Sequence, residues 1–196
     1  TAAETVARGD IKYLLGWQQG SFGYRVSPVL VEEPEEAEKL IFSPLCVSSL
    51  ASYLAKVEKP PLPRGQEPDR RKVALMVKGC DSRAVVQLLV EKGLERDQLV
   101  ILGCPCPGVV DLHLLQEKYP ETAAPVEMAW QESNFLLRAN GRETLIPREE
   151  VLAERCRLCR YPNPVISDLL IGETVEPWEP AADQAVEDLE KASLAE

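Results

Sequence analysis

The residues with the greatest chemical potential in this sequence are its six cysteines. Cys156 and Cys159 form a Cys-x-x-Cys pair, a spacing that lets both sulfurs reach one metal ion or one cluster edge from a single turn of backbone. Such a pair supplies only half of a four-ligand site. The remaining ligands must come from elsewhere in the chain, and Cys80, Cys104 and Cys106 are the candidates.

Thiolate is the metal-binding form of cysteine, so the surroundings must stabilise negative charge. Cys80 lies just before an expected helix, whose free N-H groups and dipole favour an anion. A 4Fe-4S cluster with four thiolates is itself anionic, and nearby cations raise its potential. Four basic residues could balance this charge, although a plain solvated face would also account for the arginines: Lys78, Arg83, Arg157 and Arg160.

Zinc is the main alternative metal, because four cysteines can close a tetrahedral structural site. Zinc ribbons typically use two Cys-x-x-Cys knuckles, however, and this chain has one. Single cysteines dispersed along the chain are more typical of an iron-sulfur cluster. The sixth cysteine, Cys46, falls within an expected helix that begins at Ser43-Pro44, and we expect it to be structural.

The candidate ligands follow the strands of an expected βαβ unit. Residues 73–77 and 99–102 are short apolar runs typical of buried parallel strands, and residues 84–91 between them form an apolar-rich helix. Ligands of such sheets lie beyond the carboxyl ends of the strands. Cys80 follows the first strand and Cys104 and Cys106 follow the second, so the fold itself is expected to bring thiols together.

The rest of the chain is read as supporting structure. We expect a helix over 1–9, a strand over 11–15, an extended segment over 26–31 and a proline-rich linker over 58–72. A helix over 111–118 precedes extended residues 126–147, where Asn140-Gly141 predicts a tight hairpin turn. A helix opening at Pro147 then leads to Cys156. The expected fold class is therefore α/β, with a βαβ-containing sheet, ligand loops at strand carboxyl ends and a hairpin.

A glycine-rich segment follows the strand expected over 11–15. Such loops can let backbone amides approach a phosphate group, although a plain turn explains the segment as well. The residues concerned are Gly16, Gly20, Ser21 and Gly23.

The charge is concentrated at the C-terminal end. The chain has 196 residues and a net charge of −10, which argues against a general nucleic-acid or anionic-membrane binder. Residues 173–196 carry eight acids and one base, a net of −7. We expect an α/β domain over 1–172 and an acidic tail over 173–196, whose residues 181–194 form either a partner-docking helix or a solvated segment.

The expected setting is cytoplasmic and soluble. No run of about 18 apolar residues is present for membrane insertion, and the first residues show no basic-then-apolar secretion signal. Reducing cytosol disfavours disulfides, so the six cysteines are better explained by metal or redox chemistry.

The cysteine motifs resemble the beta subunits of coenzyme F-420 (deazaflavin) hydrogenases and dehydrogenases. The matching stretches, in chain order, are Gly79-Cys80-Asp81, Gly103-Cys104-Pro105-Cys106-Pro107-Gly108, Cys156 with Cys159, and Ser167-Asp168 leading to Gly172-Glu173. The resemblance covers roughly residues 73–173. Many members also carry an N-terminal ferredoxin-like region with repeated cysteines, which has no counterpart in these residues.

The resemblance implies an electron-transferring flavin and 4Fe-4S subunit of a larger oxidoreductase. It selects Cys106 over Cys104 as the third ligand, beside Cys80, Cys156 and Cys159. It also implies a flavin such as FAD, for which the glycine-rich segment from Gly16 to Gly23 is the candidate site.

The expected function is to relay electrons between other subunits of a hydrogenase-, formate-dehydrogenase- or heterodisulfide-reductase-like assembly. With a bound flavin the chain would be a catalytic subunit, and without one an adaptor. The alternative is a structural or interaction subunit whose zinc or iron-sulfur site serves folding and assembly.

Overall fold

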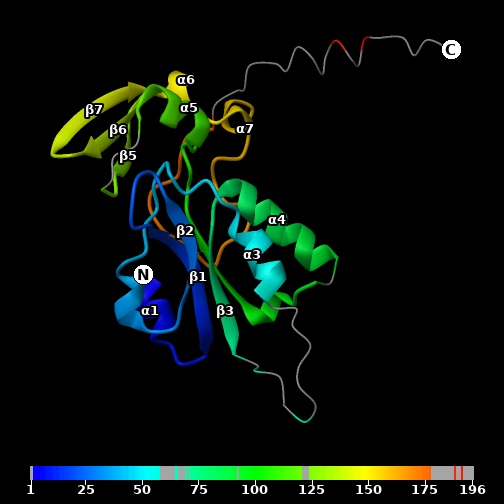
Figure 1. Cartoon of the computed structure of the whole chain (residues 1–196). Helices are drawn as coiled ribbons and strands as arrows, with labels where there is room; N and C mark the ends of the chain where they lie inside the picture. The colour runs from blue at the N-terminus through cyan, green and yellow to red at the C-terminus, as the bar shows by residue number, and fades with distance from the viewer. Residues whose placement is uncertain are drawn as a thin grey trace.

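The protein is an α/β structure with two separate sheets (Figure 1). The computed structural model describes residues 2–57, 65, 69, 71–91, 93–120, 124–177, 188 and 191. The larger sheet has five strands in the order β2-β1-β3-β4-β8, with β1 and β2 antiparallel and the other pairs parallel. Its strands are β1 (Ile11–Gln19), β2 (Val26–Val31), β3 (Lys72–Val77), β4 (Leu99–Gly103) and β8 (Leu169–Leu170).

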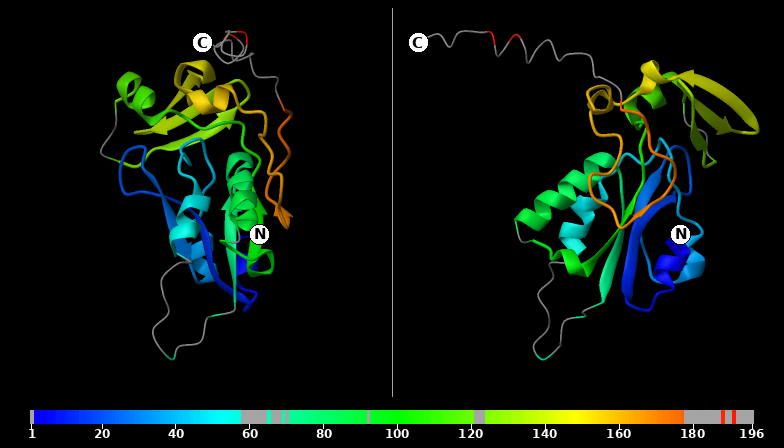
Figure 2. Two further views of the ribbon diagram at one scale, coloured as in Figure 1. Left: turned by 90° about the vertical axis from the view of Figure 1, so that its right-hand side faces the viewer. Right: turned by 180° about the vertical axis from the view of Figure 1, so that it is seen from behind.

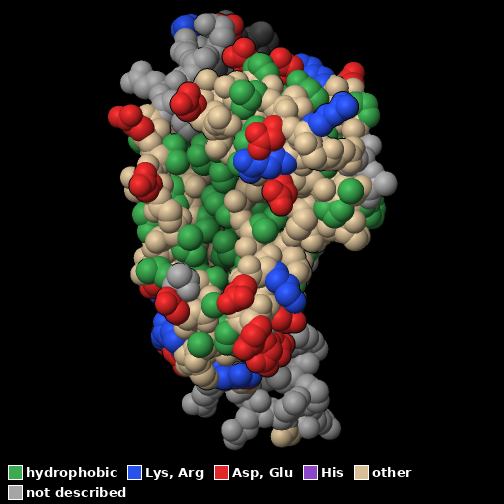
Figure 3. All heavy atoms as spheres, turned by 90° about the vertical axis from the view of Figure 1, so that its left-hand side faces the viewer, with side chains coloured by type: hydrophobic (Ala, Val, Ile, Leu, Met, Phe, Trp, Pro, Cys, Tyr) green, Lys and Arg blue, Asp and Glu red, His purple; other side chains and the backbone are tan. Residues whose placement is uncertain are grey.

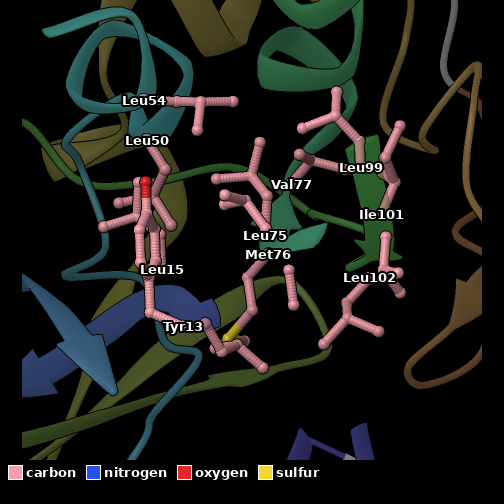
Figure 4. Close-up of a cluster of buried hydrophobic side chains, with 14 of the residues drawn as sticks. Tyr13, Leu15, Leu50, Leu54, Leu75, Met76, Val77, Leu99, Ile101 and Leu102 are labelled. Carbon is pink, nitrogen blue, oxygen red and sulfur yellow. The ribbon is translucent and has the colours of Figure 1, made fainter. Parts of the chain in front are cut away.

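Helices cover both faces of this sheet. Figures 1 and 2 show α3 (Leu50–Val57) and α4 (Gly79–Val90) on one side, with α1 (Ala2–Val6) and α2 (Pro34–Ala37) on the other. A strand covered on both faces needs apolar residues at successive positions, and β3 and β4 are buried almost throughout. Figure 4 shows side chains of β1, α3, β3 and β4 packed together in this core.

The smaller sheet is antiparallel and has its own core. It contains β5 (Glu127–Gln131), β6 (Asn134–Ala139) and β7 (Arg142–Pro147). Phe135 and Ile146 pair across β6 and β7 and are fully buried. The core also takes in residues of α5 (Leu112–Lys118) and α6 (Arg148–Val151).

Several sequence predictions are confirmed by these elements. The mixed α/β class, the parallel βαβ unit and the extended segment over 26–31 are all present. The predicted hairpin turn joins β6 to β7, and Asn140 and Gly141 have φ of 52° and 71°, the positive values that a type I′ turn requires.

The prediction that the first strand ends before Gly16 was wrong. The strand β1 continues through Gly16 to Gln19, because its ladder with β2 pairs Gly16 with Val29 and Gln19 with Val26. A Cβ atom on Gly16 would lie 2.8 Å from a methyl carbon of Leu40. The glycine therefore serves close packing in the core.

The prediction of a helix beginning at Ser43 was also wrong, since α3 begins at Leu50. The buried Lys78 ammonium donates hydrogen bonds to the carbonyls of Cys46 and Ser48, at 2.6 and 2.7 Å. Those carbonyls face Lys78 instead of a following helical turn. A tertiary contact thus overrides the local Ser-Pro signal.

The helix predicted over 84–91 begins earlier, at Gly79. The carboxylate of Asp81 accepts a hydrogen bond from the Lys78 N-H at 3.5 Å and pairs with its ammonium at 3.3 Å. These contacts start the helix before Cys80, so that this cysteine lies in its first turn.

Two predictions fall mostly outside the described residues. Of the predicted linker over 58–72, the structure describes residues 65, 69, 71 and 72, and Lys72 belongs to β3. Of the predicted tail helix it describes residues 188 and 191.

The face that lies on the left in Figure 1 carries an apolar band. Figure 3 shows hydrophobic side chains gathered in this band, with charged side chains around it. Within the described part of the chain, no helix is both long and apolar enough to cross a membrane.

Candidate functional site

Four of the predicted ligands line one cavity of about 350 Å³. They come from three chain segments: Cys80 from α4, Cys106 from the loop after β4, and Cys156 and Cys159 from the region of α7 (Glu154–Arg157). Figure 1 shows α7 beyond the N-terminal end of α4. Segments far apart in sequence therefore bring these thiols together.

Cys80 is positioned by the start of α4. The preceding residue, Gly79, packs so closely that a Cβ atom there would lie 1.9 Å from the Tyr161 carbonyl oxygen. Only glycine permits this approach without movement of the backbone. The close contact brings the first turn of α4 against the segment that follows Cys159.

Cys106 is held by backbone contacts on either side. The Cys104 N-H donates to the Val77 carbonyl at 2.7 Å, and the Cys106 N-H donates to the Pro162 carbonyl at 2.8 Å. Gly108 has φ of 120°, and a Cβ atom there would lie 2.8 Å from a methyl carbon of Leu152. The loop is thus fixed between β3 and the segments on either side of α7.

Cys156 and Cys159 are positioned by a break between two short helices. The helix α6 ends at Val151, whose carbonyl accepts from the Asp111 N-H at 2.7 Å, and the Ala153 N-H donates to the Val109 carbonyl at 2.9 Å. These bonds tie the break to the loop that carries Cys106. The single helix predicted to lead to Cys156 is therefore two helices.

Backbone N-H groups point at two of the sulfurs. The Val109 N-H donates to Cys156 Sγ at 3.5 Å, and a hydrogen bond from the Gly108 backbone favours the thiolate form of Cys106. Hydrogen bonds of this kind to ligand sulfurs are a recognised means of tuning iron-sulfur clusters.

Two of the metal-free thiols, Cys80 and Cys106, hold their protons. Burial raises the pKa of Cys106 to about 12. The side chain of Cys80 is exposed at its outer side but partly desolvated by the surrounding protein, and this desolvation, with the negative charge of Asp81, raises its pKa. Binding to a metal would displace these protons, because thiolate is the form that coordinates.

The side chains as placed do not form a ready metal centre. A tetrahedral ion at about 2.3 Å from each sulfur brings the four sulfurs within about 4 Å of one another. Within the part of the chain that the structure describes, no three His, Cys, Asp or Glu side chains form a group that could hold a metal ion.

The other two cysteines lie away from this cavity, in the core of the larger sheet. Cys104 is fully buried, and its Sγ contacts the Leu102 carbonyl at 3.8 Å. Cys46 is also fully buried, and its Sγ accepts from the Ser43 N-H at 3.3 Å. The structure therefore brings Cys106, and not Cys104, to the predicted site.

The four predicted charge-balancing residues differ in their surroundings. Lys78 lines the cavity but is ion-paired with Asp81. Arg83 and Arg160 line a second hollow on the outer side of Cys80. Arg157 donates to the Glu149 carbonyl and pairs with Glu154 at 3.3 Å, and it lines neither space.

Arg148 is a site residue that the sequence reasoning missed. It lies in α6, where burial lowers its pKa, and negative charge on Cys156 or Cys106 would favour its charged form. Its guanidinium also borders Gly108. The only sequence signal was its place at the start of the helix leading to Cys156, which does not reveal the direction of the side chain.

The residues considered for a flavin lie in and beside the β1-β2 hairpin. Gly16 is inside β1, the Gly20 N-H donates to the Arg25 carbonyl at 2.7 Å, and the Gly23 N-H donates to the Ala124 carbonyl at 3.2 Å. Ser21 is exposed in the turn between them. A phosphate-binding loop needs free amides, so these glycines do not fit that role.

Comparisons with known proteins give a relationship at the level of fold. No protein-family model matches the chain. Among solved structures it is similar to a chain of the F420-reducing [NiFe] hydrogenase complex from Methanosarcina barkeri, with a TM-score of 0.62, 16% sequence identity and 82% of this chain covered. The match spans 58% of the length of that chain. The chain therefore shares the fold of a subunit from a multisubunit oxidoreductase.

Proposed function

We propose that this chain is an iron-sulfur electron-transfer subunit of a multisubunit oxidoreductase. The observation that supports this most directly is the convergence of Cys80, Cys106, Cys156 and Cys159 on one cavity. The fold shared with a hydrogenase-complex chain agrees with a subunit role. When bound, a 4Fe-4S cluster would supply one-electron redox chemistry.

The chain's own residues would hold such a cluster and stabilise its charge. The four thiols would bind it as thiolates, and the Val109 N-H would donate to one ligand sulfur. Arg148 would add positive charge beside two of the four. No step is assigned to a flavin, because the amides of Gly20 and Gly23 already bond within the fold.

Anaerobic purification followed by iron, sulfide, zinc and flavin assays tests this function. We expect about four iron and four acid-labile sulfide atoms per chain, with an electron paramagnetic resonance signal after reduction. Zinc without iron would show instead a structural site that serves folding and assembly. Stoichiometric flavin would make the chain a catalytic subunit.

Single Cys→Ser variants test the ligand assignment. Cys106→Ser and Cys159→Ser should lose most of the iron, because a hydroxyl is a poor ligand for a soft site. Cys46→Ser is the matched control, since its hydroxyl can accept the same Ser43 N-H bond, and it should retain iron. Equal iron content in Cys159→Ser and in the unaltered protein, with both folded by circular dichroism, would contradict the assignment.

A further inference from the structure

A second hollow of about 280 Å³ lies on the outer side of the thiol site. It is lined by Cys80 and Cys159, which belong to that site, and by residues of α4 and of the segment after α7. Cys80 is exposed, although it is the second residue of a helix that packs against the core. The thiol site is therefore closest to solvent at Cys80.

The charge around this hollow is of one sign. Arg83, Arg155 and Arg160 line it, and no carboxylate is among the lining residues. Arg83 lies 4.3 Å from the centroid of the Tyr161 ring, and Arg155 donates to the Val47 carbonyl at 3.1 Å. Within the described ranges, none of the three forms an ion pair, whereas the nearby Arg157 is paired with Glu154. Their charge is thus available to a partner.

Two exposed apolar side chains stand among these arginines. Leu158 is 40% exposed and Tyr161 is 45% exposed. Tyrosine and arginine are enriched at the energetic centres of protein interfaces, where an apolar group is covered and charged groups surround it. A small anion would satisfy the arginines but leave Leu158 and Tyr161 in water, whereas a protein surface would cover both.

We infer that this basic hollow, defined by Arg83, Arg155, Leu158, Arg160 and Tyr161, is the docking site for a small acidic one-electron carrier protein. The inference rests on the proposed function and names the partner of that site. A cluster held by the four thiols would exchange one electron with the carrier, so that one is oxidised as the other is reduced, and no proton or group would be transferred. Attraction between opposite charges raises the rate of encounter. The electron would then have a short route to the thiol site through Cys80 or Cys159.

Binding of an acidic plant-type [2Fe-2S] ferredoxin, measured by calorimetry on the full chain, tests the inference. We expect saturable binding that weakens about tenfold between 50 and 200 mM salt. The double variant Arg83→Glu/Arg160→Glu should raise Kd at least tenfold, equivalent to about 1.4 kcal/mol. Lys39→Glu/Arg142→Glu, the same charge change at two exposed positions outside the hollow, is the matched control and should change Kd less than about twofold.

Three outcomes would overturn the docking site. These are the absence of saturable ferredoxin binding up to about 1 mM, an equal loss in the control variant, or tight pyrophosphate binding that displaces ferredoxin. The last result would reassign the hollow to a small anion. Iron and sulfide assays on the same samples report separately on the proposed function.

Discussion

Two cations beside the thiols have different electrostatic roles. Lys78 is 3% exposed, pairs with Asp81, donates to two carbonyls and lies 4.5 Å from the centroid of the Trp17 ring. Its charge is therefore largely balanced within the fold, and its main effect is structural. Arg148 instead borders Gly108 of the thiol site, where negative charge on Cys106 or Cys156 would favour its charged form.

Replacing Arg148 should change the reduction potential of the loaded protein. Arg148→Met removes a positive charge beside two ligands, and we expect a potential lower by tens of millivolts, since nearby charges interact by about 1–4 kcal/mol. Arg148→Lys keeps the charge and should restore most of the potential. Spectroelectrochemical titration measures both. An equal shift in both variants would assign a packing role to Arg148.

At the scale of elements, the sequence predicts most strands but misplaces two helix starts. Apolar runs and the Asn140-Gly141 turn are local signals, and the strands they predict are present. The signal at Ser43-Pro44 is also local, but Lys78, distant in sequence, takes up the carbonyls that a helix would need. Contacts of this kind cannot be read from one segment.

The short strand β8 depends on one carboxylate. Asp168 Oδ2 accepts from the Ile101 N-H at 2.8 Å, and Oδ1 accepts from Arg96 at 2.6 Å. The Asp168 N-H also donates to the Ile101 carbonyl at 2.8 Å. These bonds place Leu169 and Leu170 beside β4. The sequence identified Asp168 only as part of the motif that leads to Gly172. The structure shows that its side chain holds β8 beside β4.

Asp168→Asn should make the stability of the protein less dependent on pH under acidic conditions. Burial raises the pKa of Asp168, but the bonds from Arg96 and Ile101 outweigh it and leave the pKa below its ordinary value. A lowered folded pKa contributes stability that is present above the unfolded pKa near 4 and is lost as pH falls through the folded value. The variant lacks this contribution and should lose about 1 kcal/mol at neutral pH, a small cost because the side chain is 39% exposed.

Melting temperatures between pH 2 and 7 measure this effect. Asp10→Asn, which alters the exposed ion pair with Arg8, is the control and should follow the unaltered protein closely. If the melting temperatures of Asp168→Asn and of the unaltered protein changed equally with pH, the ion pair between Asp168 and Arg96 would contribute no stability.

For the whole molecule, the thiol site joins two separately packed cores. Cys80 begins a helix on the larger sheet, while Cys156 packs against the core of the smaller sheet. The βαβ pattern alone predicted that thiols would meet at strand carboxyl ends. It could not place the smaller sheet or Arg148, because their positions depend on the break after Val151 and its bonds to the loop after β4.

Removing the proposed cluster should therefore destabilise the whole chain. A ligand present at about 1,000 times its Kd stabilises the folded state by about 4 kcal/mol, which corresponds to a fall in Tm of about 8–16 °C on removal. Calorimetry before and after anaerobic chelation measures this change, and hydrogen exchange should rise most in β5 to β7. An unchanged Tm, with loss of metal confirmed, would show that the two cores hold together without it.

The order of the ligands along the chain has a consequence for biogenesis. Cys80 leaves the ribosome long before Cys159, and the segments between them form β4, α5 and the entire smaller sheet. The long-range closure of this site must follow the folding of those parts. Under the proposed function, a nascent chain would therefore be competent for cluster insertion only late in its synthesis, and until then Cys80 would have to be kept reduced without its partners.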